Sequence, residues 1–568
     1  MKQYITGAQA LMESLLHEGV DTIFGYPGGA IIPVFDAMYD YADKLHYVLT
    51  RHEQGATHAA QGYARVSGKV GVCIVTSGPG ATNTITGIGD ALMDSTPMVV
   101  ITGQVGKSLL GTDAFQEIDL VGITQPITKW SYQIRDEKEI PWAVARAFYI
   151  AKSGRPGPVV LDFAKNAQAA KFDYEPATCN FIRSYLPNHP LDHDAVKAAA
   201  QLINQAKKPL ALVGHGVTIG KAEEELKEFL DKADIPAAWT LLGESAMPTS
   251  YRLNKGMLGM HGNIGPNIKT NECDLLIAIG MRFDDRITGD LNAYAKQAKV
   301  IHFDIDIAEI DKNVKTDVAV LGDVKNTLPA VTAHLQQNTH SEWIDSFKEY
   351  EELEMEKVIR HELNPPVGSP ITMGEVVRKV SDATNRKAIL VTDVGQNQME
   401  AVRYFQFEEK RSVVTSGGAG TMGFGIPAAI GAKIAKPERT VCLFCGDGGF
   451  QMTMQELGTI IQEKLDIKMI LMNNNYLGMV RQWQELFFDQ RYSSTPMVNP
   501  DFTTIANAYN IPTKLVTKRE DLDDAISDMI KSDNSFLLVV NVQEQSLVYP
   551  MTPAGGSVTT ILLNENNK

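Results

Sequence analysis

The chain has 568 residues, enough for roughly three or four domains, and its 44% hydrophobic and 21% charged residues are ordinary for a soluble globular protein. Its net charge of −15 argues against nucleic acid or an anionic membrane as a partner, since both attract basic surfaces. The sequence has no apolar run of about 18 residues, no presequence pattern and only five cysteines. We therefore expect a cytoplasmic protein with no membrane span, no targeting segment and no disulfide framework.

The first third alternates short apolar runs with stretches of helical spacing. The runs that we expect to be strands lie at residues 22–24, 47–50, 71–75 and 98–101. Alternating strands and helices imply a parallel sheet, whose ligand-binding loops gather at the carboxyl ends of the strands. The long loop at residues 103–117 places an aromatic side chain beside polar ones, which is typical of a functional loop.

Glu53 lies in the sequence Arg-His-Glu-Gln-Gly-Ala at residues 51–56, where the second strand gives way to a helix. On position alone, Glu53 is an acid stabilised by the positive end of the helix macrodipole. The six residues also resemble the activating-glutamate motif of thiamin diphosphate (ThDP) enzymes. In that family the glutamate bonds N1′ of the aminopyrimidine, and the 4′-imino nitrogen then takes the proton of thiazolium C2. A positioned carboxyl group is suited to sharing such a proton.

The middle third follows a polar stretch with three prolines at residues 168–190, which we predict to be a linker. Strands are expected within residues 209–216, 274–280 and 300–306. The first of them enters the glycine turn Gly214-x-Gly216, and the third ends in acidic residues. This pattern hints at a nucleotide site but lacks the full Rossmann fingerprint. A nucleotide-binding domain and a plain α/β spacer domain both fit the spacing.

Two further patterns have structural interpretations. Residues 335–365 are charged and helically spaced, which predicts a solvated connecting helix that ends at Pro365 and Pro366. Cys442 and Cys445 form a C-x-x-C pair, but the pair falls in an expected strand. Residues three apart on a strand point to opposite faces, so we expect neither a zinc site nor a redox disulfide.

The last third contains the sequence Cys-Gly-Asp-Gly-Gly-Phe at residues 445–450, directly after an apolar strand. A helix is expected from Gln451, and its first N–H groups suit a phosphate. Asn474 follows the next strand after about 30 residues, the length of one β-α-β unit. The oxygen atoms of Asp447 and Asn474 suit Mg2+ that bridges a diphosphate. An ordinary glycine turn is the alternative, but the combination resembles the ThDP motif.

Five stretches together resemble the catalytic (large) subunits of the acetohydroxyacid synthase, or acetolactate synthase, family, and the resemblance covers nearly the whole chain in order. Two of them, Phe-Gly-Tyr-Pro-Gly-Gly-Ala at 24–30 and the stretch at 51–56, also occur loosely in related enzymes. The other three separate this family from its relatives. They are Gly-Thr-Asp-Ala-Phe-Gln-Glu at 111–117, Arg-Phe-Asp-Asp-Arg at 282–286 and Gly-Met-Val-Arg-Gln-Trp-Gln at 478–484.

The resemblance implies an α/β fold of three doubly wound parallel-sheet domains, with two ThDP domains flanking a Rossmann-like FAD domain. The expected divisions are a pyrimidine-binding domain at 1–168, a central FAD-binding domain at 190–335, a diphosphate- and Mg2+-binding domain at 370–545 and a C-terminal tail at 546–568. In the family, ThDP lies between the pyrimidine domain of one chain and the diphosphate domain of its partner. The resemblance therefore implies a homodimer or homotetramer, often joined by a small regulatory subunit.

The family's functional residues carry over by position. Mg2+ would be held by Asp447, Asn474 and the backbone carbonyl of Tyr476. The substrate channel would be lined by the catalytic residues Phe115, Gln116 and Lys165 and by Arg286 and Trp483. ThDP would be contacted by Gly29, Glu53, Pro79, Asn83, Gln396, Gly420 through its carbonyl, Met422 as a wedge, Gly446, Asp447, Gly448, Asn474, Tyr476, Gly478 and Met479. FAD would be contacted by Arg155, Gly214, Thr240, Leu241, Met260, His261, Gly280, Arg282, Asp304, Ile305 and Asp323.

The implied activity is decarboxylation of pyruvate on ThDP, followed by condensation of the hydroxyethyl enamine with a second 2-ketoacid, pyruvate or 2-ketobutyrate. The products would be 2-acetolactate or 2-aceto-2-hydroxybutyrate, in the first common step of branched-chain amino acid biosynthesis. One alternative is a related ThDP enzyme, either a pyruvate oxidase or a flavin-free catabolic acetolactate synthase. Another is a non-catalytic scaffold or regulatory homologue, against which the intact Glu53, Asp447 and Asn474 argue.

Overall fold

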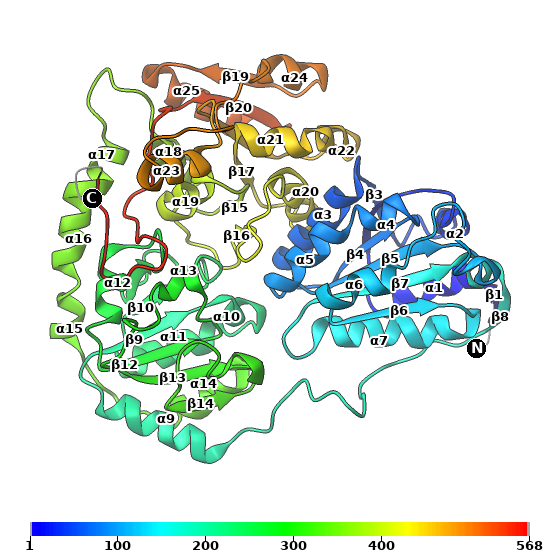
Figure 1. Ribbon diagram of the computed structural model, residues 1–568, viewed down its shortest axis with the longest axis horizontal. Helices are drawn as coiled ribbons and strands as arrows, with labels where there is room; N and C mark the ends of the chain where they lie inside the picture. Colours follow the sequence, from blue (N-terminus) through cyan, green and yellow to red (C-terminus); the bar gives the residue numbers. More distant parts are fainter. Residues whose placement is uncertain (1–2, 565–568) are drawn as a thin grey trace.

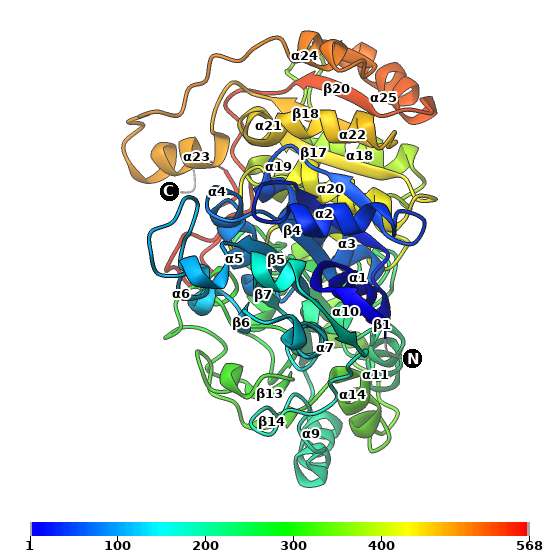
Figure 2. The ribbon, with the colours of Figure 1, turned by 90° about the vertical axis from the view of Figure 1, so that its right-hand side faces the viewer.

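Three six-stranded parallel sheets, each covered by helices on both faces, make up most of the chain (Figure 1). The computed structural model describes residues 3–564. Figure 2 shows the first sheet toward the viewer, with the third domain above it and the middle domain below. The expected α/β class with three parallel sheets is therefore confirmed. Within residues 3–564, none of the helices combines the length and the apolar character that crossing a bilayer requires.

The first sheet has the strand order β3-β2-β4-β5-β7-β6. Its strands are β2 (Thr22–Tyr26), β3 (His46–Leu49), β4 (Gly71–Val75), β5 (Met98–Gln104), β6 (Trp130–Ile134) and β7 (Pro158–Ala164). Its helices are α1 (Gly7–His17), α2 (Ile32–Tyr39), α3 (Glu53–Ser67), α4 (Pro79–Thr82), α5 (Ile85–Met93), α6 (Leu120–Thr124), α7 (Ile140–Lys152), α8 (Lys165–Ala169) and the 3-10 turns η1 (Lys107–Leu109), η2 (Gln125–Ile127) and η3 (Glu137–Glu139). Helices α1 and α7 pack on one face of the sheet, while α3 and α5 pack on the other.

The stretch that we predicted to be a linker begins with a strand. Strand β8 (Lys171–Tyr174) pairs antiparallel with β1 (Gln3–Thr6). Phe172 and Tyr174 are buried against the core around α1, whereas the residues between and before them are exposed. The linker prediction is wrong for these residues. Apolar and polar side chains alternate along them, which indicates a strand, but the prediction gave more weight to the prolines that follow.

The middle sheet has the order β11-β10-β9-β12-β13-β14. Its strands are β9 (Pro209–Val213), β10 (Ala237–Trp239), β11 (Asn254–Met257), β12 (Leu275–Ile279), β13 (Lys299–Asp304) and β14 (Val318–Leu321). Its helices are α9 (His193–Gln205), α10 (His215–Ile219), α11 (Glu223–Ala233), α12 (Ile264–Thr270), α13 (Asp285–Thr288), α14 (Val324–Thr332) and the 3-10 turn η4 (Ile307–Glu309). Helices α9, α11 and α14 cover one face of this sheet.

The segment expected to be a solvated connecting helix is broken into short helices and is partly buried. Its pieces are α15 (Ser341–Asp345), α16 (Lys348–Glu354), the π-helical turn η5 (Met355–Ile359) and α17 (Arg360–Leu363), which run along the edge of the middle domain (Figure 1). Trp343 and Phe347 lie in the core on the other face of the middle sheet. The indole of Trp343 donates a hydrogen bond to the carbonyl of Pro209 at 2.8 Å. The prediction of a solvated helix is therefore wrong for the side of this segment that carries Trp343 and Phe347.

The third sheet has the order β16-β15-β17-β18-β20-β19. Its strands are β15 (Ile389–Thr392), β16 (Val413–Val414), β17 (Val441–Gly446), β18 (Lys468–Asn473), β19 (Thr513–Val516) and β20 (Phe536–Asn541). Its helices are α18 (Met373–Ala383), α19 (Gln396–Tyr404), α20 (Gly425–Ala435), α21 (Asp447–Thr453), α22 (Leu457–Gln462), α23 (Gly478–Phe487), α24 (Phe502–Ala508), α25 (Leu522–Lys531) and the 3-10 turns η6 (Met454–Glu456) and η7 (Arg519–Asp521). Cys442 and Cys445 lie in different cores on opposite faces of β17, and both are free thiols.

Helices α3 and α20 join the first and third domains through one shared core. They approach so closely that a Cβ atom at Gly62 would overlap the carbonyl of Ala428, and one at Gly431 would overlap the carbonyl of Ala59. Glycine is required at both positions because the neighbouring atoms are backbone and cannot rotate away.

We expect Gly431→Ala to destabilise the protein by about 1–3 kcal/mol, the usual cost of overpacking a core. Gly89→Ala in α5 is the matched control, because a Cβ atom there meets nothing within 4 Å. Alanine at such a position stabilises a helix by roughly 1 kcal/mol relative to glycine. Melting temperatures of both variants check the prediction, and equal values would show that α3 and α20 pack more loosely than described.

Candidate functional site

Asp447 is the first residue of α21 and lies directly after β17. The expected helix start at Gln451 is therefore wrong, because Gly448 and Gly449 are helical. A Cβ at Gly448 would lie 2.8 Å from Cδ2 of Leu477, so glycine serves close packing here. The buried carboxylate of Asp447 accepts hydrogen bonds from Asn499 Nδ2 at 2.7 Å and from the N–H of Gly448 at 2.9 Å. Burial raises the pKa of Asp447.

Asn474 lies at the same edge of the sheet, just after the neighbouring parallel strand β18. Its Oδ1 atom accepts the N–H of Tyr476 at 3.3 Å, and its Nδ2 atom lies 3.5 Å from Oε1 of Gln396. The donor set of one carboxylate, one side-chain amide and one backbone carbonyl consists of hard oxygens, which fit Mg2+. Residues 3–564 contain no cluster of three or more His, Cys, Asp and Glu that would hold a softer metal.

Several other residues expected to contact ThDP lie around this edge. A Cβ at Gly478 would lie 2.9 Å from Nδ2 of Asn474 and would overlap Oε1 of Gln396, so these three residues are in contact. The Cε atom of Met422 lies 3.4 Å from the Cβ position of Gly448. Gly420 has a φ of 65°, a left-handed conformation that glycine adopts without strain. The structure thus brings the diphosphate-side residues of the third domain together.

A cavity of about 790 Å³ lies where residues of all three domains meet, within the size range of cofactor sites. Its lining includes all the residues expected to contact FAD except Gly214, together with Gly420, Met422, Met479, Arg286 and Trp483. Gly214 lies just behind the wall, at the end of β9, where its N–H donates to the carbonyl of Ile279 at 2.9 Å. The neighbouring Gly216 lines the cavity and would not tolerate a side chain, since a Cβ there would lie 2.7 Å from Cα of Gly280.

Polar groups on the cavity wall are suited to a large ligand with charged and neutral parts. His261 is buried, and burial followed by the nearby charge of Arg403 lowers its pKa to about 4, so the ring is neutral at pH 7. Its Nδ1 atom is buried without a hydrogen-bond partner in the structure. Arg155 belongs to the first domain, and its Nη1 atom lies 2.7 Å from Oε1 of Glu309 and 3.4 Å from Oδ2 of Asp306 in the middle domain. These features fit FAD, which presents an anionic diphosphate and a flat ring.

Glu53 and its expected neighbours form a second group at the first sheet. Glu53 begins α3, and its Oε2 atom accepts a hydrogen bond from Asn83 Nδ2 at 2.9 Å. Its Oε1 atom lies 3.3 Å from the Cβ position of Gly80, next to Pro79. The Nζ atom of Lys165 donates to the carbonyl of Gly29 at 3.2 Å.

The loop expected to line the substrate channel lies beside this group. Gln116 has a φ of 59°, a left-handed conformation, and its Cβ atom lies 2.9 Å from the Cβ position of Gly78. Phe115 is 87% exposed, so no part of residues 3–564 covers its ring.

One chain keeps these two groups apart. Among the described residues that line the 790 Å³ cavity, none belongs to the group around Glu53. In Figure 1, α4 beside Glu53 and α23 beside the cavity lie on opposite sides of α20. Within the described residues of one chain, the cavity with the neighbouring edge of the third sheet is therefore distinct from the group around Glu53, and we refer to them as the two half-sites of the proposal below.

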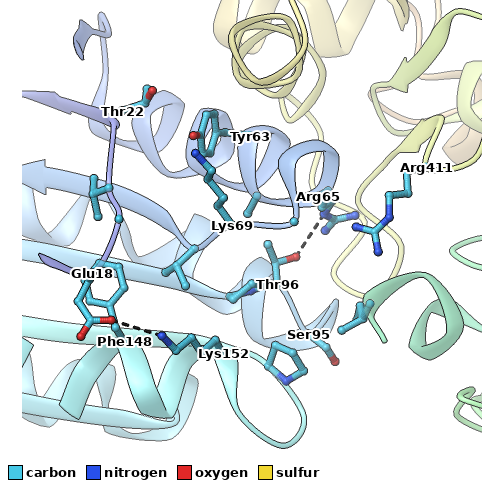
Figure 3. A pocket seen from close by; sticks show the side chains of 18 of the residues that line it. Glu18, Thr22, Tyr63, Arg65, Lys69, Ser95, Thr96, Phe148, Lys152 and Arg411 are labelled. Atoms are coloured by element: carbon cyan, nitrogen blue, oxygen red, sulfur yellow. Dashed lines mark hydrogen bonds and ion pairs between the residues drawn. The ribbon is translucent and has the colours of Figure 1, made fainter. Parts of the chain in front are cut away.

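A further cavity of about 400 Å³ lies between the first domain and α10 of the middle domain (Figure 3). Charged side chains surround it, but they pair with acids of the same chain. Lys152 contacts Glu18 at 3.3 Å, Lys69 contacts Asp21, and Arg65 contacts Asp94 at 2.7 Å. These three cationic side chains of the cavity wall are therefore already neutralised by ion pairs with acids of the same chain.

Two residues at the site were missed by the sequence analysis. Asp393, at the end of β15, accepts the N–H groups of Gly423 at 3.0 Å and Gly425 at 2.9 Å, and burial raises its pKa. An acid after an apolar strand was a usable signal for it. Asn499 lies in a polar loop far along the chain and donates to Asp447. No local pattern marks Asn499.

Comparisons with known proteins agree with this geometry. Residues 5–123 match the family described as "Thiamine pyrophosphate enzyme, N-terminal TPP binding domain". Residues 196–331 match the central domain of the same enzymes, and residues 393–540 match their C-terminal TPP binding domain. The three matched regions contain the three parallel sheets, apart from β6 and β7 of the first sheet and β15 of the third.

Relatives resemble the chain over nearly its whole length. "Acetolactate synthase isozyme 2 large subunit" of Escherichia coli is 44% identical over 559 residues, which cover 98% of this chain and 99% of that protein. "Acetolactate synthase large subunit" of Parasynechococcus marenigrum is 45% identical, covering 98% of this chain and 90% of that protein. "Acetolactate synthase large subunit" of Lactococcus lactis is 43% identical, covering 97% and 95%. This chain therefore belongs to the acetolactate synthase large-subunit family of thiamine pyrophosphate enzymes.

Proposed function

We propose that the protein is an acetolactate synthase, which joins the two-carbon unit left by decarboxylated pyruvate to a second 2-ketoacid. The products are 2-acetolactate and, from 2-ketobutyrate, 2-aceto-2-hydroxybutyrate, as the first common step toward the branched-chain amino acids. The observation that carries the proposal is full-length similarity to acetolactate synthase large subunits, together with Glu53 at the start of α3 and Asp447 at the start of α21.

The third domain holds the anionic end of ThDP in this proposal. Asp447, Asn474 and the carbonyl of Tyr476 would hold Mg2+, and the charge of the metal would favour the diphosphate. Gly446, Gly448, Gln396 and Gly478 lie around the same edge of the sheet. ThDP, when bound, supplies the electron sink for decarboxylation.

Glu53 would be the residue that holds a proton at N1′ of the aminopyrimidine when ThDP is bound. The hydrogen bond from Asn83 fixes one oxygen of its carboxylate and orients the group. Gly29 and Pro79 shape this half of the site. The Gly420 carbonyl would accept a hydrogen bond from the 4′-amino group, and Met422 and Met479 would pack against the cofactor.

We propose that a homodimer or homotetramer forms the complete site, with Glu53 of one chain facing Asp447 of its partner. The separation of the two half-sites within one chain supports this arrangement. Large subunits such as the relatives named above suggest a small regulatory subunit as a further partner. The proposed domains are residues 1–168, 190–335 and 370–545, followed by the tail 546–568.

The 790 Å³ cavity is proposed to bind FAD, with its wall residues in the roles that the sequence analysis assigns to them. Since the overall reaction transfers no electrons, the flavin is structural for the net chemistry. Phe115, Gln116 and Lys165 are proposed to meet Arg286 and Trp483 across the two chains and to bind the 2-ketoacids there. Lys165 and Arg286 suit the substrate carboxylates because both are cationic.

Trp483→Leu is expected to remove much of any preference for 2-ketobutyrate over pyruvate as the acceptor. Trp483 lines the cavity from α23, and one methylene in an apolar pocket is worth about 10–200-fold in discrimination. The measurement is the product ratio when the two ketoacids compete. Phe487→Leu is the matched control. Phe487 lies on the same helix, and its ring centroid is 5.1 Å from that of Trp483, but it does not line the cavity. An unchanged ratio with a lowered melting temperature would make Trp483 a purely structural residue.

The direct test of the proposed function is an assay of the purified protein with pyruvate, ThDP, Mg2+ and FAD. We expect acetolactate to form without an added electron acceptor. Acetate formation that depends on an electron acceptor would indicate a pyruvate oxidase instead. Full activity of a flavin-free preparation would indicate a catabolic acetolactate synthase, and no turnover of pyruvate would indicate a non-catalytic homologue.

A further inference from the structure

The glycine-rich loop after β16 is held in place by a helix of another domain. This loop, residues 415–424, carries Gly420 and Met422 into the wall of the 790 Å³ cavity. Gly420 and Gly423 have φ values of 65° and 84°. Glycines lose more conformational freedom on folding than other residues, so a loop of this kind keeps one shape only when contacts hold it.

Asp94, at the end of α5 in the first domain, binds the middle of this loop. Its Oδ2 atom accepts the N–H of Gly417 at 2.9 Å, and its Oδ1 atom accepts the N–H of Gly418 at 2.7 Å. A Cβ atom at Gly418 would lie 3.0 Å from Oδ1 of Asp94 and 2.9 Å from Cβ of Met93. The carboxylate therefore binds two successive backbone amides, and the close contacts at Gly418 leave no room for a side chain there.

Asp90, one turn earlier on α5, binds the two positions that bracket Gly420. One carboxylate oxygen of Asp90 accepts the hydroxyl of Ser416 and, at 2.9 Å, the hydroxyl of Thr421. The hydroxyl oxygen of Ser416 in turn accepts the N–H of Thr421 at 2.9 Å. Ser416 and Thr421 of the loop are thus hydrogen-bonded to each other, and Asp90 attaches both of them to α5.

The position of these two acids is unfavourable for α5 itself. Asp90 and Asp94 are like charges four residues apart, and they lie at the negative end of the helix macrodipole. Both side chains are buried, and burial followed by the charge of Asp94 raises the pKa of Asp90. Local helix stability therefore does not account for either acid, whereas the contacts with the loop do.

Arg65 compensates the charge of Asp94. Its Nη2 atom lies 2.7 Å from Oδ2 of Asp94, its Nε atom donates to the hydroxyl of Thr96 at 3.2 Å, and its Nη1 atom donates to the carbonyl of Thr415 in the loop. Figure 3 shows Arg65 at the end of its helix, directed toward the ribbon of the third domain. Carboxylate, guanidinium and loop thus form one buried network across two domains.

We propose that Asp94 is a positioning residue of the cofactor site, which fixes the N–H groups of Gly417 and Gly418 and thereby the direction of the Gly420 carbonyl. The proposal rests on the proposed function, because ThDP is the group that this carbonyl would receive. It extends that function to Asp94, a residue of the 790 Å³ cavity wall that the sequence analysis assigned to neither cofactor nor substrate. The first domain of a chain then has two roles: it supplies Glu53 to one site and holds the cofactor loop of another.

The test compares Asp94→Asn with Thr96→Val in the cofactor-free protein by hydrogen exchange. The asparagine side chain keeps the shape of Asp94 but turns one acceptor into a donor, so one of the two loop amides loses its partner. We expect the amides of residues 415–424 to exchange about tenfold faster in Asp94→Asn. Thr96→Val removes only a contact of Arg65 and should exchange like the wild type. Calorimetry should show ThDP binding weakened about tenfold in Asp94→Asn, and kcat for acetolactate should fall while KM for pyruvate stays nearly constant.

A second variant separates positioning from plain stability. Asp94→Asn leaves the charge of Arg65 buried and unpaired, which also lowers the melting temperature. The double variant Arg65→Leu/Asp94→Asn removes both charges and should regain most of that melting temperature, while loop exchange stays fast and ThDP affinity stays low. If the double variant regains wild-type exchange and affinity, or if Asp94→Asn alone shows neither change, the proposal is wrong. A wild-type protein that binds no ThDP would overturn the proposed function instead, because loop exchange is measured without the cofactor.

Discussion

Glu53→Gln is expected to lower acetolactate formation by about 10²–10⁴-fold, the usual contribution of a general acid–base group. Glutamine keeps the shape of the side chain and an oxygen that accepts the hydrogen bond now made by Asn83 at 2.9 Å. It cannot take or give the proton at N1′ of the aminopyrimidine. The fold should survive, since Glu53 makes no ion pair in the described structure and begins its helix near the surface of a half-site.

Initial rates with saturating ThDP, Mg2+ and pyruvate check this expectation. Glu13→Gln serves as the control, because Glu13 lies in the same domain and accepts the hydroxyl of Tyr41 at 2.9 Å, and neither residue lines the 790 Å³ cavity. Its turnover should stay near that of the wild type. Near wild-type turnover by Glu53→Gln would remove Glu53 from the mechanism.

Asp447→Ala is expected to weaken the binding of Mg2+ and ThDP together, by about 10–100-fold or more. Asp447 is the one carboxylate among the proposed ligands, so its loss leaves the metal with neutral oxygens only. The cation and the diphosphate bind through each other, and both affinities should therefore fall. Isothermal titration of ThDP with and without Mg2+ measures the two effects.

Asp501→Ala is the matched control in the same domain. The exposed carboxylate of Asp501 accepts the N–H groups of Thr503 and Thr504 at the start of α24, and it forms no hydrogen bond with the proposed metal ligands. Its loss should cost roughly 0.5–2 kcal/mol of stability and leave ThDP affinity unchanged. If Asp447→Ala also binds ThDP with unchanged affinity, the metal site lies elsewhere.

Local patterns were sufficient to predict the parallel α/β class and the arrival of Asp447 and Asn474 at one edge of the third sheet, although strands such as β6, β10 and β19 were not predicted. Strand β17 and the glycines after it place Asp447, and strand β18 places Asn474, because the carboxyl ends of neighbouring parallel strands meet at one edge. The role of Glu53 came instead from the resemblance of residues 51–56 to a family motif, because its position between a strand and a helix indicates only an acid at a helix start. Each of these residues lies within a few positions of the pattern that marks it.

Contacts between distant segments were not predictable in this way. Asn499, which donates a hydrogen bond to Asp447, lies in the loop that follows α23 in the sequence. Asp94, which accepts the N–H of Gly417, lies in a different domain. Neither residue stands in a pattern that differs from an ordinary loop or helix end. The burial of Trp343 was missed for a related reason, since the charged residues around it indicated a solvated helix.

The separation of the two half-sites has a consequence that mixed dimers can reveal. If Glu53 of one chain serves Asp447 of its partner, a dimer of one Glu53→Gln chain and one Asp447→Ala chain contains one intact site and one doubly altered site. If both residues of a site came from one chain, no dimer of these two variants would contain an intact site. Symmetric dimers exchange such partners without changing their interface.

The most direct test is therefore acetolactate formation by the two inactive variants, refolded or co-expressed together in equal amounts. Random pairing makes half of the dimers mixed, with one intact site in each, so about a quarter of the wild-type activity should return. Each variant alone should stay at its own low rate under the same conditions. A mixture no more active than the average of the two variants would contradict the account, because it would place Glu53 and Asp447 of each active site in the same chain.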